Sequence, residues 1–184
     1  MYHRIIDNFL PEEEFKELSE YVMSRHITWL RSTFVSHIEE QDQKEFIENL
    51  DHQYFTNIGY TRHEQKSHLY EKCAPLLIRL QYIDHGKDPF RPHFRALIRL
   101  KANLIPHTHE MMEHASHYDY EYEHKSAVFG INTCDGFTRL GTGKDSITIP
   151  SVANRLLIFN GWELHNSSTT TDAKARVNLN LNYI

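Results

Sequence analysis

The chain has few cysteines and no long apolar run, and both absences exclude whole classes of protein. With only Cys73 and Cys134 in 184 residues, a disulfide framework cannot form, which favours a reducing, cytoplasmic location. The longest apolar runs, such as Leu156–Phe159, are far shorter than the roughly 20 residues that a membrane-spanning helix needs. The N-terminus shows no secretory pattern. We therefore expect no membrane partner.

Basic charge is also in short supply. The chain has 20 lysines and arginines against 25 acidic residues, which gives a net charge of −5 with histidine neutral. Binding of duplex nucleic acid depends on a basic surface that neutralises phosphates, so this balance argues against such a partner. A peptide, a free amino acid or another small metabolite remains as the class of substrate.

Glycine is scarce, whereas histidine is abundant. The chain has 7 glycines and 14 histidines, and such a content of imidazole directs the search toward metal ligands. No internal repeat, low-complexity tract or long linker divides the sequence, so we expect one domain over 1–184. The pattern changes near residue 93, which separates an N-terminal strand and helix support, 1–92, from a β-rich core, 93–184.

Helical spacing dominates the first part of the chain. A stripe of Phe15, Leu18 and Val22 predicts one amphipathic helix. A second helix is expected over 69–80, begun or kinked at Pro75. The polar and aromatic segment between these two helices shows no clear pattern.

After residue 93 the spacing changes to period two, which indicates β-strands. Asp135-Gly136 and Asn160-Gly161 are strong turn signals between such runs. This pattern favours a mainly β fold with flanking helices, in which a double-stranded β-helix (jelly roll) rests on an N-terminal helical support. The expected strands are Arg95–Leu104, Ala115–Tyr120, Ser126–Asn132, Phe137–Leu140, Ser146–Ile149, Arg155–Phe159, His165–Thr169 and Ala175–Tyr183.

The last of these strands separates polar from apolar side chains. Its polar face carries Arg176, Asn178, Asn180 and Asn182, while valine, leucine and tyrosine fill the other face. The polar face can lie in water, as on a half-exposed strand. Alternatively, it lines the inside of the barrel while the apolar face packs on the helices, which requires polar partners or a polar ligand inside. The strand alone leaves both arrangements open.

Three separated residues have the types and spacing of a metal site. His117 and Asp119 stand two positions apart on an expected strand, so their side chains point to the same face. His165 begins a later strand, and Arg176 lies on the strand after that. Two imidazoles and one carboxylate form the facial triad of non-haem Fe(II) oxygenases, which leaves further positions on the metal open. A surface pair of histidines with a structural arginine is the simpler alternative.

Four stretches extend this pattern along the chain. They are H-Y-D at 117–119, H-K-S-A-V-F-G-I-N-T-C-D-G-F-T at 124–138, N-R-L-L-I-F-N-G-W-E-L-H at 154–165 and R-V-N-L-N-L-N-Y at 176–183. Together they resemble the catalytic core of the 2-oxoglutarate/Fe(II)-dependent dioxygenases, in particular the small prolyl-hydroxylase-like members of bacteria and phages. The opening I-I-D-N-F-L-P-E-E-E-F and R-L-K-A-N-L at 99–104 are similar to such proteins as well.

This resemblance implies an oxidoreductase with two cofactors. His117, Asp119 and His165 would ligate Fe(II) at the catalytic centre. Arg176 would hold the distal carboxylate of 2-oxoglutarate, which a planar guanidinium can pair with through two parallel hydrogen bonds. The implied reaction hydroxylates a substrate and releases succinate and CO2, with ascorbate as the reductant in an assay.

Two asparagines are further candidates for cofactor binding. Asn103 lies on the first strand of the expected core, and Asn178 follows Arg176 on the same face. Either can donate a hydrogen bond to 2-oxoglutarate, and a purely structural role is the alternative for each.

Other interpretations compete with the dioxygenase. His107, His109 and Glu113 have the H-x-H-x3-E spacing of the first metal motif of the cupins, although the glycine expected further on is absent. A solvated histidine-rich loop is the simpler alternative for this segment. A non-catalytic jelly-roll binding module is another hypothesis, which a missing member of the triad would favour. His93 and His124 have no partner spacing and are expected at the surface.

Aromatic residues flank the proposed metal ligands. Tyr118, Tyr120, Tyr122 and Trp162 can line a substrate mouth or can be packing residues. Because loops at the mouth of a barrel carry specificity, we expect the N-terminal half and the loop 107–116 to shape the substrate cleft.

Overall fold

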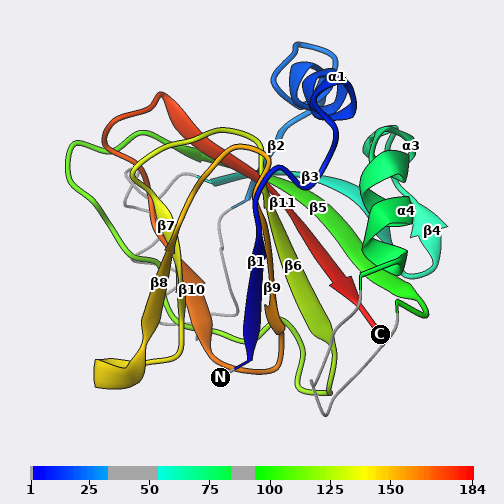
Figure 1. Ribbon diagram of the computed structural model, residues 1–184. Coiled ribbons are helices and arrows are strands. Elements are labelled where there is room, and N and C mark those ends of the chain that lie inside the picture. Colours follow the sequence, from blue (N-terminus) through cyan, green and yellow to red (C-terminus); the bar gives the residue numbers. More distant parts are fainter. Residues whose placement is uncertain (1, 33–53, 84–93) are drawn as a thin grey trace.

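Two antiparallel sheets form the body of the protein (Figure 1). The computed structural model describes residues 2–32, 54–83 and 94–184. Within these ranges the larger sheet has eight strands, in the order β1 (His3–Ile6), β9 (Leu156–Asn160), β6 (Lys125–Gly130), β11 (Ala175–Tyr183), β5 (Leu97–Pro106), β3 (Tyr54–Thr61) and β2 (Leu30–Ser32), with β4 (Glu64–Gln65) beside β3. The smaller sheet has the order β10 (His165–Ser167), β7 (Phe137–Leu140) and β8 (Ile147–Pro150). The expectation of a mainly β fold is confirmed.

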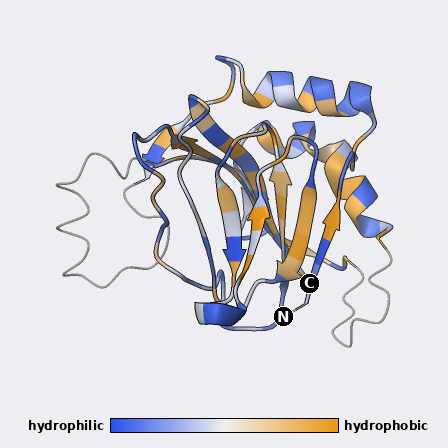
Figure 2. Cartoon of the chain, turned by 60° about the vertical axis from the view of Figure 1, so that its left-hand side comes forward, coloured by the Kyte–Doolittle hydropathy of each residue, from blue (hydrophilic) through white to orange (hydrophobic). Residues whose placement is uncertain are grey.

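Helices lie on one side of the larger sheet, and the smaller sheet lies on the other (Figure 1). They are α1 (Glu12–Val22), α3 (Leu69–Lys72) and α4 (Ala74–Gln81), and a 3-10 turn, η2 (Gly143–Asp145), precedes β8. Hydrophilic and hydrophobic residues alternate along these helices, as expected of helices that cover a sheet with one face (Figure 2). The buried stripe of α1, Leu18 and Val22, belongs to the same apolar cluster as Leu179 and Leu181 of β11.

The expected helix over 69–80 is broken into α3 and α4. Pro75 occupies the first turn of α4, where its missing N–H costs nothing, and Cys73 lies between the two helices. Leu69, Leu76 and Leu80 are fully buried against the larger sheet. Cys73 and Cys134 are both buried free thiols. In the described part of the chain, no helix is long and apolar enough to cross a membrane.

The space between the two sheets is apolar at one end. Leu157 and Phe159 of β9 pack there against Leu140 of β7 and Ile149 of β8. The alternate residues of β9 join the helix-facing core instead, so all five residues of this strand are buried. This explains why β9 is a continuous apolar run rather than an alternating one.

The other end of this space is polar, and the polar face of β11 lines it. Arg176, Asn178 and Asn182 are only 2%, 6% and 0% exposed, while Leu179 and Leu181 are buried on the opposite face. The second arrangement of the last strand is therefore the observed one.

Strand β5 continues this polar surface because its register with β11 is regular. The paired positions are Arg176 with Ile105, Asn178 with Asn103, Asn180 with Lys101, and Asn182 with Arg99. We call these four pairs of side chains the polar ladder. Strand β3, from the N-terminal part of the chain, pairs with the far edge of β5, so strands from both sides of residue 93 share one sheet.

The expected strand Ala115–Tyr120 is wrong. This segment meets the region of β10 only through two isolated bridges, Glu113 with Ser168 and His117 with His165. One side of the pairing advances by four residues while the other advances by three, so a bulge interrupts continuous hydrogen bonding. The remaining expected strands are present, with shifts of one to three residues at their ends.

The residue Asn154 joins the start of α1 to the turn between β8 and β9. Its side chain accepts a hydrogen bond from the Leu10 N–H at 2.9 Å and donates one to the Leu10 carbonyl at 2.8 Å. Its own carbonyl accepts from the Phe9 N–H at 3.0 Å. The backbone of Asn154 is left-handed, with φ of 57°, a conformation that asparagine tolerates better than most residues.

We predict that Asn154→Ala destabilises the protein by about 3 kcal/mol, because two buried hydrogen bonds and a residue suited to the left-handed backbone are lost together. Asn154→Gly keeps the backbone freedom and should cost only about 2 kcal/mol. Urea unfolding of the two variants and the wild type measures both effects. Equal loss in the two variants would exclude the backbone contribution, and no loss in either would exclude the hydrogen bonds.

Candidate metal centre and its cavity

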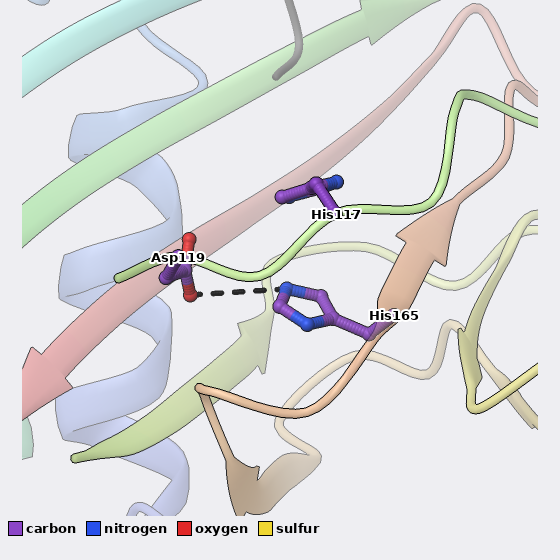
Figure 3. Close-up of side chains that lie close together, drawn as sticks. All are labelled: His117, Asp119 and His165. Carbon is purple, nitrogen blue, oxygen red and sulfur yellow. Dashed lines mark ion pairs between the residues drawn. The ribbon is translucent and has the colours of Figure 1, made fainter. Parts of the chain in front are cut away.

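The structure brings His117, Asp119 and His165 together. One ligand atom from each of them lies within 4.8 Å of the other two. The Nε2 atom of His165 is 3.8 Å from Oδ2 of Asp119, and the imidazole centroids of the two histidines are 4.6 Å apart. All three side chains point into one space, two from the extended segment before β6 and one from β10 (Figure 3).

Backbone hydrogen bonds fix this approach even though no regular strand contains His117. The N–H groups of His117 and His165 each donate to the carbonyl of the other residue at 2.9 Å. The Asp119 N–H donates to the Gly161 carbonyl at 3.0 Å, in the turn that follows β9. The segment that carries two of the three residues is therefore tied at both ends to the turn and strand that carry the third.

Both histidines have the tautomer that a metal site needs. The Nδ1 atom of His117 faces the carbonyl of Ala115 at 3.2 Å, and that of His165 faces the carbonyl of Glu163 at 2.9 Å. A proton on Nδ1 leaves Nε2 free as a ligand atom. Burial, together with repulsion from His165, lowers the pKa of His117 to about 4 despite the attraction of Asp119, so this imidazole is neutral at pH 7.

The Asp119 carboxylate is ionised and is held from two sides. Arg99 donates to Oδ1 at 2.7 Å, while Ser126 and Asn182 donate to Oδ2 at 2.6 and 2.8 Å. Burial opposes ionisation of this 5% exposed side chain. The Arg99 and His165 charges and the two hydrogen bonds to Oδ2 outweigh burial and hold the pKa of Asp119 well below its usual range.

The close approach of Gly161 makes room for this arrangement. A Cβ atom at Gly161 would lie 2.1 Å from Nε2 of His124 and 2.3 Å from Oγ of Ser126. The backbone of Gly161 also donates to the His124 carbonyl at 3.1 Å and accepts from Asp119. The Asn160-Gly161 pair is thus required for close packing beneath Asp119 as well as for a turn.

A cavity of about 470 Å³ of empty space extends from the three metal-site residues into the molecule. It lies between the two sheets, because β5 and β11 of the larger sheet and β7 and β10 of the smaller sheet all contribute to its wall. Its lining includes His117, Asp119, His165, Asn103, Asn178 and Arg176, which are all six site residues expected from the sequence, together with Tyr54, Lys101, Thr138 and Asn180.

Arg176 is buried in this cavity without a carboxylate partner among the described residues. Its guanidinium donates to the Ser151 hydroxyl at 2.6 Å, the Ser168 carbonyl at 3.2 Å and the Thr138 hydroxyl at 2.9 Å. Burial lowers its pKa to about 10, so it stays charged at neutral pH. Gly136 leaves space for this side chain, since a Cβ atom there would lie 2.8 Å from Cδ of Arg176. A buried cation that faces only neutral groups favours an anionic ligand.

The two asparagines of the expected site contact each other. Nδ2 of Asn103 donates to Oδ1 of Asn178 at 2.8 Å, and the Tyr54 hydroxyl donates to Oδ1 of Asn103. The amide of Asn103 is therefore engaged within the protein. The Nδ2 group of Asn178 has no acceptor among the described residues and lines the cavity, so it remains available as a donor.

Sequence reasoning missed Tyr54, Arg99 and Lys101 as site residues. The last two lie on β5 with Asn103, where polar and apolar residues alternate as they do on β11. That alternation was the signal that could have identified them. Burial and the Arg99 charge lower the pKa of Lys101 to about 7, against the attraction of Asp119. Tyr54 lies in the segment for which the sequence offered no pattern.

The cupin-like set does not assemble. Among the described residues, only His117, Asp119 and His165 form a group of three or more such ligands, so His107, His109 and Glu113 are not brought together. Both oxygens of Glu113 accept hydrogen bonds from Arg139, at 2.7 and 2.8 Å.

One of the two histidines expected at the surface is buried. His124 is 1% exposed, because the Gly161 turn and neighbouring aromatic rings cover it, and its Nδ1 faces the Tyr122 carbonyl at 2.7 Å. That surface expectation is wrong for His124. His93 lies outside the described residues.

A second, wider hollow opens on the outer side of the metal-site residues. It has about 870 Å³ of empty space, and Tyr118, Tyr120 and Leu164 contribute apolar surface to its wall beside His117 and Asp119. Tyr118 and Leu164 are exposed large apolar side chains, which is uncommon for residues with a packing role alone. The site is therefore reached from solvent through a partly aromatic mouth.

Comparisons with known proteins identify the fold. No protein-family model and no curated protein sequence matches the chain. Among solved structures, an oxidoreductase of the 2OG-Fe(II) oxygenase family from Burkholderia pseudomallei matches with a TM-score of 0.68 and 13% identity, covering 98% of this chain and 84% of that one. A Pseudomonas putida prolyl-4-hydroxylase matches with a TM-score of 0.64 and 13% identity, over 98% and 91% of the two chains.

A third similar structure has a different activity. The non-haem alpha-ketoglutarate-dependent epimerase SnoN from nogalamycin biosynthesis matches with a TM-score of 0.65 and 11% identity, over 99% of this chain and 77% of that one. At these identities the matches establish a common fold rather than a common reaction. The chain has the fold of the 2-oxoglutarate/Fe(II) oxygenases, including their prolyl hydroxylases.

Proposed function

We propose that this protein is a non-haem Fe(II)- and 2-oxoglutarate-dependent dioxygenase that hydroxylates a peptide, an amino acid or a small molecule. One observation carries the proposal. A single cavity has a two-histidine, one-carboxylate group at one end and a buried guanidinium without a counter-ion deeper inside. A metal and a chelating anion with a second carboxylate match these two features together.

The donor set fits a ferrous ion. His117 and His165 offer Nε2 and Asp119 offers Oδ2, all from one side of the space between them. Fe(II) with bound 2-oxoglutarate would supply the oxidative chemistry, in which dioxygen converts the 2-oxoacid to succinate and CO2 and a substrate C–H group is hydroxylated. Three protein ligands leave the remaining positions of an octahedron to the co-substrate and dioxygen.

The residues of the protein would bind and orient the co-substrate. Arg176 would pair with its distal carboxylate, and Asn178 would donate a further hydrogen bond. Asn103 would act mainly by orienting Asn178, since its own amide already bonds Tyr54 and Asn178. The surrounding β-sheets would exclude water from the inner end of the cavity.

We also infer that the two sheets form a double-stranded β-helix within a single domain over 1–184. The antiparallel pairing of all strands, and a metal-site cavity between the two sheets, support this architecture. In this view the core over 93–184 carries the site, and 1–92 supports it with helices and with the strands β1, β3 and their neighbours.

The aromatic mouth would receive the substrate. The similar structures include a prolyl-4-hydroxylase and an epimerase captured with Fe3+, alpha ketoglutarate and nogalamycin RO, so this fold serves both protein and small-molecule chemistry. Tyr118, Tyr120 and Leu164 offer apolar contact surface at the mouth.

Two measurements test the proposal. Under anaerobic conditions, Fe(II) and 2-oxoglutarate added together should give a visible metal-to-ligand charge-transfer band that neither gives alone. With dioxygen and ascorbate, the protein should release succinate when a peptide or metabolite pool contains its substrate. A charge-transfer band without succinate release from any pool would favour a non-catalytic binding module instead.

We predict that Arg176→Ala abolishes measurable 2-oxoglutarate binding while leaving metal affinity nearly unchanged, because Arg176 lies away from the metal-site atoms. Arg176→Lys keeps the charge but loses the paired geometry, and should weaken binding by about 1–3 kcal/mol. Calorimetric titration of Mn(II) and then 2-oxoglutarate into the three proteins measures both affinities. Unchanged 2-oxoglutarate affinity in the alanine variant would contradict the assigned role.

We predict that Gly161→Ala weakens metal binding about 10- to 100-fold, the usual range for a disturbed partner of a metal ligand. The added methyl group must displace Ser126, which holds Asp119. Gly143→Ala is the matched control, because no atom lies within 4 Å of its Cβ position and its left-handed backbone affects stability alone. Metal titration followed by thermal unfolding separates the two effects, and equal metal affinity in both variants would refute the prediction.

A further inference from the structure

Lys101 is a charged residue of the cavity to which the proposed reaction assigns no role. It lies on β5 opposite Asn180, one step along the polar ladder from the pair Arg99 and Asn182 that holds Asp119. Arg176 lies two steps away in the opposite direction. Successive side chains on one face of a strand are about 6.7 Å apart, so the backbones of the two cation-bearing positions are separated by about 13 Å along the sheet.

The ammonium group of Lys101 has no anionic partner. Its Nζ atom lies 5.3 Å from the centroid of the Tyr54 ring, and it makes no hydrogen bond or ion pair with a described residue. Asp119 is the single carboxylate in the lining of the cavity, and Arg99 already pairs with it. Lys101 and Arg176 are thus two unpaired cations in one cavity, one near the metal-site residues and one deep inside.

This placement matches a ligand with two anionic ends. A buried cation without a partner is costly, whereas a hydrogen-bonded carboxylate offsets that cost. The long side chains of lysine and arginine reach toward each other from the two ladder positions and leave between them a gap suited to a short dicarboxylate. A monocarboxylate would leave one of the two cations unpaired.

We propose that Lys101 binds the carboxylate of the 2-oxoacid that lies next to the metal, while Arg176 binds the distal carboxylate. This inference rests on the proposed function and adds a second anion-binding residue to it. Lys101 and Arg176 together would make the site selective for dicarboxylic 2-oxoacids, with Lys101 reading the end that every 2-oxoacid shares.

The test compares two probes in the absence of any substrate. 2-Oxoglutarate carries both carboxylates, and 2-oxobutyrate carries only the one beside the keto group. Each is titrated calorimetrically into Mn(II)-loaded wild type, Lys101→Met and Arg176→Ala. Methionine matches the length and apolar stem of lysine without its charge, and Lys144→Met serves as the control because that lysine is exposed on η2.

Lys101→Met should weaken the binding of both probes by the same factor, about 10- to 100-fold, as expected for the loss of one charge-assisted hydrogen bond. Arg176→Ala should weaken 2-oxoglutarate alone and so remove the preference for the dicarboxylate. Lys144→Met should bind both probes like the wild type. The melting temperature of ligand-free Lys101→Met should equal or exceed that of the wild type, because an unpaired cation is removed.

Each other outcome overturns the inference. Unchanged affinity of Lys101→Met for both probes would mean that Lys101 does not contact the 2-oxoacid. Weakening of 2-oxoglutarate alone would assign Lys101 to the distal carboxylate. A lower melting temperature of ligand-free Lys101→Met, or loss of its Mn(II) binding, would indicate a structural role. Failure of the wild type to bind 2-oxoglutarate would instead refute the proposed function itself.

Discussion

Polar side chains buried between two sheets need hydrogen-bond partners or a ligand, and this constraint governs the organisation of the whole protein. The apolar face of β11 packs beneath the helices, so its polar face has to point inward. Strand β5 meets it in register with polar residues of its own, which satisfies part of the requirement. What remains unsatisfied is positive charge, at Arg176 and at Lys101. The interior is thus an incomplete electrostatic arrangement that a doubly anionic molecule would complete.

Asp119 connects this interior to the metal site. Asn182 and Arg99, the last pair of the polar ladder, both donate to its carboxylate. The same residue lies beside His165 and is tied by its backbone to the Gly161 turn. Metal position and sheet register are therefore coupled through one side chain. A shift of β11 along β5 would move the hydrogen-bond donors of Asp119 and would change the metal site without touching a ligand.

Much of this site could be predicted from the sequence, because its residues follow local rules. Period-two spacing identified the strands, and the separation of His117 and Asp119 by two positions survived the loss of the strand that was expected to carry them. The bulge that breaks this strand depends on the partner segment, which no local pattern encodes. The role of Arg99 depends on the same long-range pairing. His124 is buried by a turn 37 positions further along, at Gly161, and no spacing rule links the two.

The pairing of β1 with β9 has a consequence for solubility. Strand β9 is buried on both faces, and its outer hydrogen-bonding edge is covered by the four residues of β1. An uncovered edge of this kind, apolar on both faces, is a template for pairing with a second chain. Asp7 and Arg155 form an ion pair just beyond the end of that pairing, with N–O distances of 2.5 and 3.0 Å. The short strand β1 therefore acts as a guard against edge-to-edge aggregation, independently of any part it plays in the site.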